Sequence, residues 1–413
     1  MSATALRERL ASLGARPAAA RRAPPERRLP RGFEPVWTEY GLAYRLADVL
    51  PIGRVVGRLP AVCHAYLDTE TTGLSGGTGT YVFAAAICRP GPAGMEIVQL
   101  FLADPAGEAA FLYLLQEELD QAAAVATYNG GSFDLPLLRT RWVMSRMPGD
   151  LRHPEHLDLL SLTRALLRPR LDSCTLRVVE DRLLGFEREE DLPGAMVPEA
   201  YFAYLRQGWS PTLEAALEHN RQDVLSLYHL HARLLLRLAG EDSRMEAPDW
   251  LALGRHLLRA GRRADGWRAL RRAAEIGEGP ASGLAALLMA RTLARRRRPA
   301  AAEALLAGLQ LRLPAEPALA SARARLLEWG LRDLAAALGV VERALVGLPA
   351  GSPHRPDLEK RRGRLRLRLD RLDGRHQPRR PQRQASLVDE GSQGGQQGGV
   401  VRAGVRGQLV DCQ

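Results

Sequence analysis

The amino-acid sequence predicts an α/β domain followed by an all-α region, and three observations support this division. From Ala61 onward, short apolar segments separated by turn residues are typical of β-strands. The first three are spaced as in a meander, at about residues 62–68, 80–88 and 95–102. Helical patterns and short apolar segments then alternate as far as residue 240, whereas from Ala247 the chain is alanine-rich and helical.

The rest of the α/β domain contains six predicted helices, one of which begins at about Asp134, and two further strands. Apolar residues at helical spacing and at strand ends predict helices at 108–123, 159–168, 174–185, 197–204 and 211–238, and strands at 124–128 and 156–158. Pro136 and Pro198 stand near helix starts, where a missing N–H costs nothing.

Composition limits the possible classes of protein. The 413 residues are 46% hydrophobic and 25% charged, which is ordinary for two domains with terminal segments. No run of about 18 uninterrupted apolar residues occurs, and the N-terminus lacks the apolar core of a secretory signal, so we expect a cytoplasmic protein without a membrane partner. Four scattered cysteines indicate neither a disulfide framework nor a zinc site.

The net charge of +11 is unevenly distributed. Residues 61–240 carry an excess of about 8 acidic side chains, so the remaining segments carry roughly +19. An acidic domain flanked by basic arms suits a metal site in a protein that attracts polyanions such as nucleic acid. Because Lys360 is the only lysine, a base-composition bias of the coding DNA explains the arginines equally well.

These patterns divide the chain into five parts. We expect a disordered Arg/Pro-rich arm at 1–35, a lead-in segment of strands or turns at 36–60, the α/β domain at 61–240, helical repeats at 247–350, and a basic, largely disordered tail at 351–413. Within the tail, residues 361–369 alternate basic and apolar side chains, which fits either a helix extension or a strand-like segment.

The first motif is the segment from Tyr66 to Leu74, in which an apolar run leads into Asp68 and Glu70. Residues two apart on a strand point to the same face, so these carboxylates project together. Two like charges held that close need a counter-ion, and a hard divalent cation with oxygen ligands is the natural one. The alternative is a solvated pair at a strand-to-turn boundary.

The second motif runs from Tyr128 to Leu138 and delivers Asp134 at a helix start after the glycine turn that follows Asn129. Asp134 is therefore a candidate metal ligand, a helix N-cap, or both. Asp158 follows a short strand in the same way, and it is either a further site carboxylate or the cap of the helix at 159–168.

The third motif lies on the long helix at 211–238. His219 and Asp223 are four residues apart and hence on one helix face, which puts a titratable imidazole beside a candidate metal-binding carboxylate. An ordinary helical His–Asp pair is the alternative.

Together, Asp68-x-Glu70, the segment Asn129 to Asp134, and His219-Asn220-x-x-Asp223 resemble the three exonuclease motifs of the DEDD (DnaQ-like) superfamily, which has an RNase H-like fold. With His156-Leu-Asp-Leu-Leu and Asp191-Leu-Pro-Gly added, residues 61–240 are similar to the YprB-type RNase H-like branch of that superfamily. The resemblance implies an RNase H-like mixed sheet flanked by helices.

The resemblance also implies a 3′–5′ exonuclease that hydrolyses single-stranded nucleic acid by a two-metal mechanism. The expected ligands of two Mg²⁺ or Mn²⁺ ions are Asp68, Glu70, Asp134 and Asp223, with Asp158 as a possible addition. His219 would orient or deprotonate the attacking water, and Asn129 and Thr71 would contact the substrate. His219 departs from the family pattern, because a histidine here occupies the spacing of the tyrosine branch.

The C-terminal half resembles tetratricopeptide (TPR) repeats. Trp250-x-x-Leu253-Gly254-x-x-Leu257 matches a repeat start, and similar positions recur 34 residues later, although an irregular helical bundle remains the alternative. Such repeats usually dock a protein segment, whereas the run Arg295 to Arg298 could contact nucleic acid. Two further interpretations stay open for the whole chain: a non-catalytic nucleic-acid-binding scaffold, and an endonuclease on the same fold.

Overall fold

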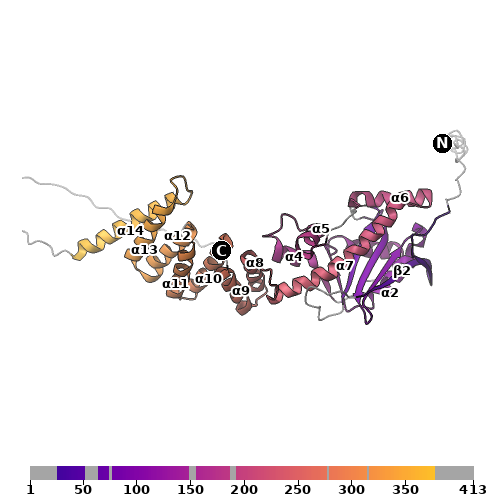
Figure 1. The fold of residues 1–413 in the computed structure, drawn as a ribbon, viewed down its shortest axis with the longest axis horizontal. Coiled ribbons are helices and arrows are strands. Elements are labelled where there is room, and N and C mark those ends of the chain that lie inside the picture. The colour runs from indigo at the N-terminus through magenta and orange to yellow at the C-terminus, as the bar shows by residue number, and fades with distance from the viewer. Residues whose placement is uncertain are drawn as a thin grey trace, which may run out of the picture.

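The computed structural model describes residues 26–51, 64–73, 77–147, 155–186, 192–276, 279–313 and 316–376. They form a sheet domain and a series of helices that extends from it, with the long helix α7 (Pro211–Ala239) running across the sheet and toward the helical part (Figure 1). The first 25 residues of the expected arm, residues 187–191 and residues 377–413 lie outside the described part.

A mixed sheet of seven strands organises the first domain. The strands are β1 (Glu34–Thr38), β2 (Gly41–Leu50), β3 (His64–Thr71), β4 (Val82–Pro90), β5 (Met95–Phe101), β6 (Ala124–Thr127) and β7 (His156–Asp158). They lie in the order β1-β2-β5-β4-β3-β6-β7, with β3, β6 and β7 parallel and the other neighbours antiparallel. The predicted mixed sheet flanked by helices is therefore confirmed.

The sheet domain begins earlier than its sequence suggests. The expected lead-in contains β1 and β2, a hairpin that extends the sheet because β2 pairs with β5. The last residues of the expected arm also contact the domain: the Arg28 amide donates to the Gly208 carbonyl, and buried Phe33 packs on Phe101. Residues 26–35, which were expected to belong to the disordered arm, are therefore held against the domain by a backbone hydrogen bond and a buried aromatic ring.

Helices cover both faces of the sheet. The domain contains α2 (Glu108–Leu119), α3 (Asp134–Met144), α4 (Leu159–Leu167), α5 (Leu176–Val179), α6 (Val197–Gln207) and α7. It also contains two short 3-10 helices, η1 (Pro105–Gly107) and η3 (Gly194–Met196), and the π-helix η2 (Glu180–Leu184). One apolar core joins the sheet to α2, α3, α6 and the start of α7. A second core lies on the opposite face, against α4 and the rest of α7.

The long helix α7 has clear start and stop signals. Pro211 occupies the first helical position, and Gly240 closes the helix in the left-handed conformation with φ 73°. Its 29 residues first contribute Leu213 and Leu217 to one core and then Val224 and Leu234 to the other. The helix therefore holds a fixed position across the sheet, which fixes the third motif relative to β3.

The C-terminal half is helical throughout its described residues. Its elements are α8 (Ala247–Arg259), α9 (Arg263–Ile276), α10 (Pro280–Arg295), α11 (Pro299–Arg312), α12 (Pro317–Arg325), η4 (Leu326–Leu331), α13 (Leu334–Gly347) and α14 (Arg355–His376). The core on the α7 side of the sheet continues into this region through Leu253 and Leu257 of α8. The two parts of the chain therefore share one apolar core at their junction.

The tail expected at 351–413 begins as an ordered helix. Leu358 and Leu365 of α14 are fully buried, and they belong to the same apolar cluster as residues of α13. Of the two conformations left open for residues 361–369, the helix is therefore the one adopted. Leu358 and Leu365 are seven residues apart and share one apolar face of the helix, but basic residues dominate the sequence between them. The composition of this segment therefore predicted disorder.

Candidate active site

The first motif lies within strand β3 rather than after it. The strand continues to Thr71, so Asp68 and Glu70 alternate with buried residues on a paired strand, and the register with β4 shifts between Glu70 and Thr71. Tyr66, two residues earlier on the same face, packs edge-on against Tyr228 of α7, with ring centroids 5.6 Å apart. Strand alternation therefore directs Asp68 toward α7.

Asn220 of α7 holds Asp68 in place. Its amide nitrogen donates to the Asp68 carboxylate over 2.7 Å and to the Asp68 carbonyl over 3.1 Å. Gln99 of β5 in turn donates to the Asn220 side-chain oxygen over 3.3 Å and to the Leu217 carbonyl over 2.7 Å. Asn220 is completely buried, so this chain of amides fixes the carboxylate from the protein interior.

The second motif brings Asp134 to the same end of the sheet. Asp134 is the first residue of α3, it is buried, and its carboxylate accepts a hydrogen bond from the Thr69 hydroxyl. The residue preceding the helix is Phe133, which makes no side-chain cap. Of the two roles considered for Asp134, the N-cap is therefore wrong in this structure, because the helix starts at Asp134 itself.

The third motif places an imidazole beside a carboxylate. His219 Nε2 lies 3.5 Å from Asp223 Oδ2, and both side chains are partly buried on one face of α7. Asn220 points from the adjacent position into the sheet, so this turn of α7 supplies contacts to Asp68 as well as a His–Asp pair.

Local hydrogen bonds occupy polar groups of three other candidate residues: Asp158, Asn129 and Thr71. Asp158 caps α4, and its Oδ1 accepts from the amides of Leu160 over 3.0 Å and Asn129 over 2.9 Å. Asn129 is exposed and adopts the left-handed conformation with φ 67°. The buried Thr71 donates its hydroxyl to the Gly73 carbonyl over 2.8 Å, an internal turn contact rather than an outward-facing group.

Electrostatics reveal which carboxylates interact. Burial raises the pKa of Asp68 well above its ordinary value, and the charges of Asp223, Glu70 and Asp134 raise it further, against the opposing hydrogen bond from Asn220. Burial also raises the pKa of Asp134, which the Thr69 hydrogen bond opposes and the charge of Asp158 reinforces. The three other carboxylates of the motifs, Asp223, Glu70 and Asp134, thus lie close enough to Asp68 to disfavour its charged form.

Metal binding can be assessed from the donor set. Within the described ranges, no group of three or more His, Cys, Asp or Glu side chains is arranged so that it could hold a metal ion. Three of the carboxylates instead contact protein groups: Asn220 donates to Asp68, Thr69 donates to Asp134, and His219 lies beside Asp223. An all-carboxylate donor set nevertheless has the chemistry that hard divalent cations prefer.

The sequence did not identify three residues that position the carboxylates: Asn220, Gln99 and Thr69. Gln99 carried a recognisable signal, because it is a polar residue inside the apolar strand β5 and only 2% exposed. Asn220 was visible only as a neighbour of His219. Its contact with Asp68 joins residues that are 152 positions apart, so local sequence could not reveal it.

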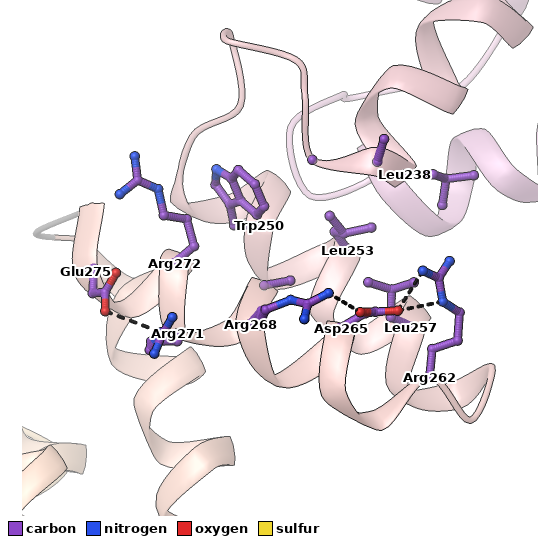
Figure 2. Close-up of a pocket in the computed structure, with 13 residues that line it drawn as sticks. Leu238, Trp250, Leu253, Leu257, Arg262, Asp265, Arg268, Arg271, Arg272 and Glu275 are labelled. Atoms are coloured by element: carbon purple, nitrogen blue, oxygen red, sulfur yellow. Dashed lines mark hydrogen bonds and ion pairs between the residues drawn. The ribbon is translucent and has the colours of Figure 1, made fainter. Parts of the chain in front are cut away.

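A separate hollow of about 340 Å³ lies where the end of α7 meets α8 and α9 (Figure 2). Arg262 and Arg268 both pair with Asp265 there, and Arg271 pairs with Glu275. None of the motif carboxylates lines this hollow, and three of its four arginines pair with a carboxylate there. Among the helices that the structure describes, none is long and apolar enough to cross a membrane.

Comparison with known proteins assigns the class of the sheet domain. Residues 65–235 match the RNase H superfamily, in agreement with the mixed sheet and its flanking helices. These residues form an RNase H-like domain.

The chain is also homologous to the uncharacterised protein YprB of Bacillus subtilis, with 36% identity over 180 residues. The aligned region covers 43% of this chain and 43% of that relative, so the likeness spans less than half of either protein. A family B DNA polymerase from the archaeon Pyrobaculum calidifontis aligns over 80% of this chain and 51% of its own, with 15% identity and a TM-score of 0.35. At that level the alignment bears on neither fold nor function.

Proposed function

We propose that the sheet domain is a metal-dependent 3′–5′ exonuclease that hydrolyses single-stranded nucleic acid. The observation that carries the proposal is the crowding of Asp223, Glu70 and Asp134 around Asp68 at one end of the sheet. Mutually repelling carboxylates destabilise a fold, so their presence at one place is best explained by a ligand that neutralises them. The RNase H superfamily match supports a nuclease-related role for this domain.

The four carboxylates would hold two Mg²⁺ or Mn²⁺ ions. When bound, such ions activate the attacking water and stabilise the departing 3′ oxygen. Asn220 and Thr69 keep Asp68 and Asp134 oriented for this purpose. His219, beside Asp223, would orient the water or accept its proton, a role that suits an imidazole near neutral pH.

A non-catalytic nucleic-acid-binding scaffold is the second candidate. The lack of a preformed set of three metal ligands among the described residues favours it. In either case, the helices from α8 to α13 would act as TPR-like repeats that dock a protein partner. The thiols of Cys88 and Cys174, which are not joined in a disulfide, agree with the cytoplasmic location that belongs to this proposal.

The test follows the release of nucleotides from single-stranded RNA and DNA labelled at the 3′ or the 5′ end, with Mn²⁺, Mg²⁺ or EDTA. We expect metal-dependent release of 3′ mononucleotides, lost on Asp68→Asn. An internal cut would produce labelled fragments of intermediate length and would identify an endonuclease instead.

A matched control removes a carboxylate from the opposite end of the sheet. Asp120 follows the last residue of α2 and precedes β6, so it lies at the opposite end of β6 from Asn129, and its carboxylate accepts a hydrogen bond from the Gln116 side chain. Asp120→Asn should leave nucleotide release unchanged. Binding of the strand without turnover, equal in the wild type and Asp68→Asn, would reject the exonuclease and favour the scaffold.

A further inference from the structure

A groove opens beside the carboxylates and leads away from them. It encloses about 690 Å³ and begins at Tyr128 and Asn129, immediately after β6. Helix α4 forms one wall, and the segment from Leu171 to Leu176 forms the other. Because the Asn129 amide donates to Asp158 and Asp158 adds to the charge felt by Asp134, the mouth of this groove adjoins the candidate active site.

Two arginines line the groove: Arg164 of α4, and Arg168, which follows the last residue of α4 and keeps the helical backbone conformation. They are four residues apart, so they lie on one face of the helix about one turn apart, and both are exposed. Among the described residues, neither guanidinium has a carboxylate in ion-pair contact, whereas nearby Arg170 pairs with Asp249 over 2.7 Å. Exposed guanidinium groups without such partners are well suited to bind phosphate.

The groove continues toward the helical region. It joins a larger hollow of about 840 Å³, which is also lined by Leu171, Asp172 and Ser173. This larger hollow reaches Arg244 and Glu246, next to the start of α8. Its arginines are partly compensated, since Arg170 also pairs with Glu246. The Tyr128 hydroxyl donates a hydrogen bond to the Cys174 carbonyl over 2.7 Å. This bond fixes the groove wall formed by residues 171–176 to the end of β6.

We propose that this groove binds the nucleotides of a single strand that precede its reacting 3′ end, with Arg164 and Arg168 each contacting one backbone phosphate. The inference rests on the proposed exonuclease function and specifies how its substrate is held. Charge complementarity carries it: the groove is lined by two arginines without an ion-pair partner among the described residues and by one carboxylate, Asp172, and it starts beside a cluster of carboxylates. A polyanion is therefore attracted into the groove and a divalent cation to the cluster.

The test compares a substrate that fills the groove with one that does not. The first is a 3′-labelled 12-nucleotide strand, and the second is the p-nitrophenyl ester of thymidine 5′-monophosphate, which has no neighbouring nucleotides. For Arg164→Ala/Arg168→Ala we expect KM for the strand to rise about tenfold and its salt dependence to weaken by about 1.4 in logarithmic slope, the value for two phosphates of a single strand. Hydrolysis of the small ester should not change.

Two further variants make the result specific. Arg164→Lys/Arg168→Lys keeps both charges and should keep the salt dependence. Arg268→Ala/Arg272→Ala removes two exposed arginines with the same spacing from α9, and it should leave KM for the strand unchanged. An unchanged KM in the α4 double variant, or an equal loss in the α9 double variant, would overturn the groove assignment.

Failure of the proposed function can be recognised separately. If the wild type hydrolyses neither substrate, the exonuclease proposal fails, and filter binding of the strand in EDTA still tests the groove with the same variants. Weaker binding only in the α4 double variant would then support the groove as a binding site of the scaffold.

Discussion

At the scale of single residues, the site consists of charged groups and the neutral groups that orient them. The Asp68 carboxylate accepts a hydrogen bond from the Asn220 amide, and the Asn220 side-chain oxygen accepts one from Gln99. These buried amides therefore link β5, α7 and β3. The charged members were recognisable from the sequence because they recur in three spaced motifs. The neutral members were not, because their contacts form only when distant segments fold together.

Neutralising Asp68 should stabilise the protein while abolishing activity. Asp68→Asn keeps an oxygen that can accept from Asn220, and it removes the charge that repels Asp223, Glu70 and Asp134. In the absence of divalent metal we expect a gain of about 1 kcal/mol, visible as a Tm higher by about 2–4 °C. A lower Tm than that of the wild type would mean that the carboxylates do not repel one another in solution.

Removing the amide of Asn220 should affect catalysis more than substrate binding. Asn220→Ala leaves the Asp68 carboxylate without its side-chain donor, which should cost about 2 kcal/mol of stability. As a positioning residue, its loss should lower kcat and leave KM for the strand unchanged. Gln222→Ala, on the same helix, is the control: among the described residues its side chain bonds only to Ser226, and the substitution should change stability by less than about 0.5 kcal/mol.

At the scale of elements, periodicity predicted most helices and strands near their observed positions. Strand β3 is an exception: it was expected to end at about residue 68, yet it pairs as far as Thr71. The polar motif residues resemble a turn in sequence, but pairing with β4 keeps them extended. The hairpin of β1 and β2 was expected only as a lead-in, because nothing local indicates that β2 pairs with β5.

The contact between α8 and α9 depends on two glycines. A Cβ atom on Gly254 would lie 2.8 Å from the Leu270 side chain and 3.1 Å from the Gly266 carbonyl oxygen. Gly254→Ala should therefore separate the helices and cost about 1–3 kcal/mol in urea unfolding. Gly308→Ala in α11 meets no atom within 4 Å and should be neutral or slightly stabilising, which provides the control. Equal stability of both variants would contradict close α8–α9 packing.

At the scale of the whole molecule, the junction between the sheet domain and the helices is both apolar and ionic. Beside the shared core, buried Arg237 pairs with Asp242 and with Asp249, and Arg233 also pairs with Asp242. The continuous core explains why the helical region extends from α7 in a defined direction (Figure 1). Sequence analysis predicted both parts of the chain but could not predict this junction, because its partners come from both.

Buried imidazoles should make the folded protein sensitive to mild acid. Burial, reinforced by the neighbouring His64, lowers the pKa of His231 to about 4, and its Nδ1 lies 2.9 Å from the Tyr66 hydroxyl. Burial also lowers the pKa of His156, His229 and His256. Below about pH 6.5 these histidines therefore bind more protons in the unfolded chain than in the folded protein. The free energy of unfolding should fall as the pH drops from about 6.5 toward 4.

Urea unfolding at pH 7.5 and pH 5 measures this effect. Complete protonation of His231 would lower the free energy of unfolding by about 3 kcal/mol, so the urea concentration at the unfolding midpoint should be clearly lower at pH 5 than at pH 7.5. The raised pKa values of Asp68 and Asp134 act in the opposite direction, since these groups take up protons more readily when folded. His231→Asn isolates the imidazole and should reduce the pH dependence, and an unaltered dependence would exclude His231 as its source.

The proposed exonuclease function requires that Asp68 be the centre of a divalent-cation site. Calorimetric titration with Mn²⁺ tests this claim most directly, with the wild type, Asp68→Asn and the control Asp120→Asn compared at one pH and ionic strength. We predict saturable binding of two ions by the wild type and the control, and loss or marked weakening on Asp68→Asn with the fold retained. Equal binding by all three proteins, or none by the wild type, would contradict the account.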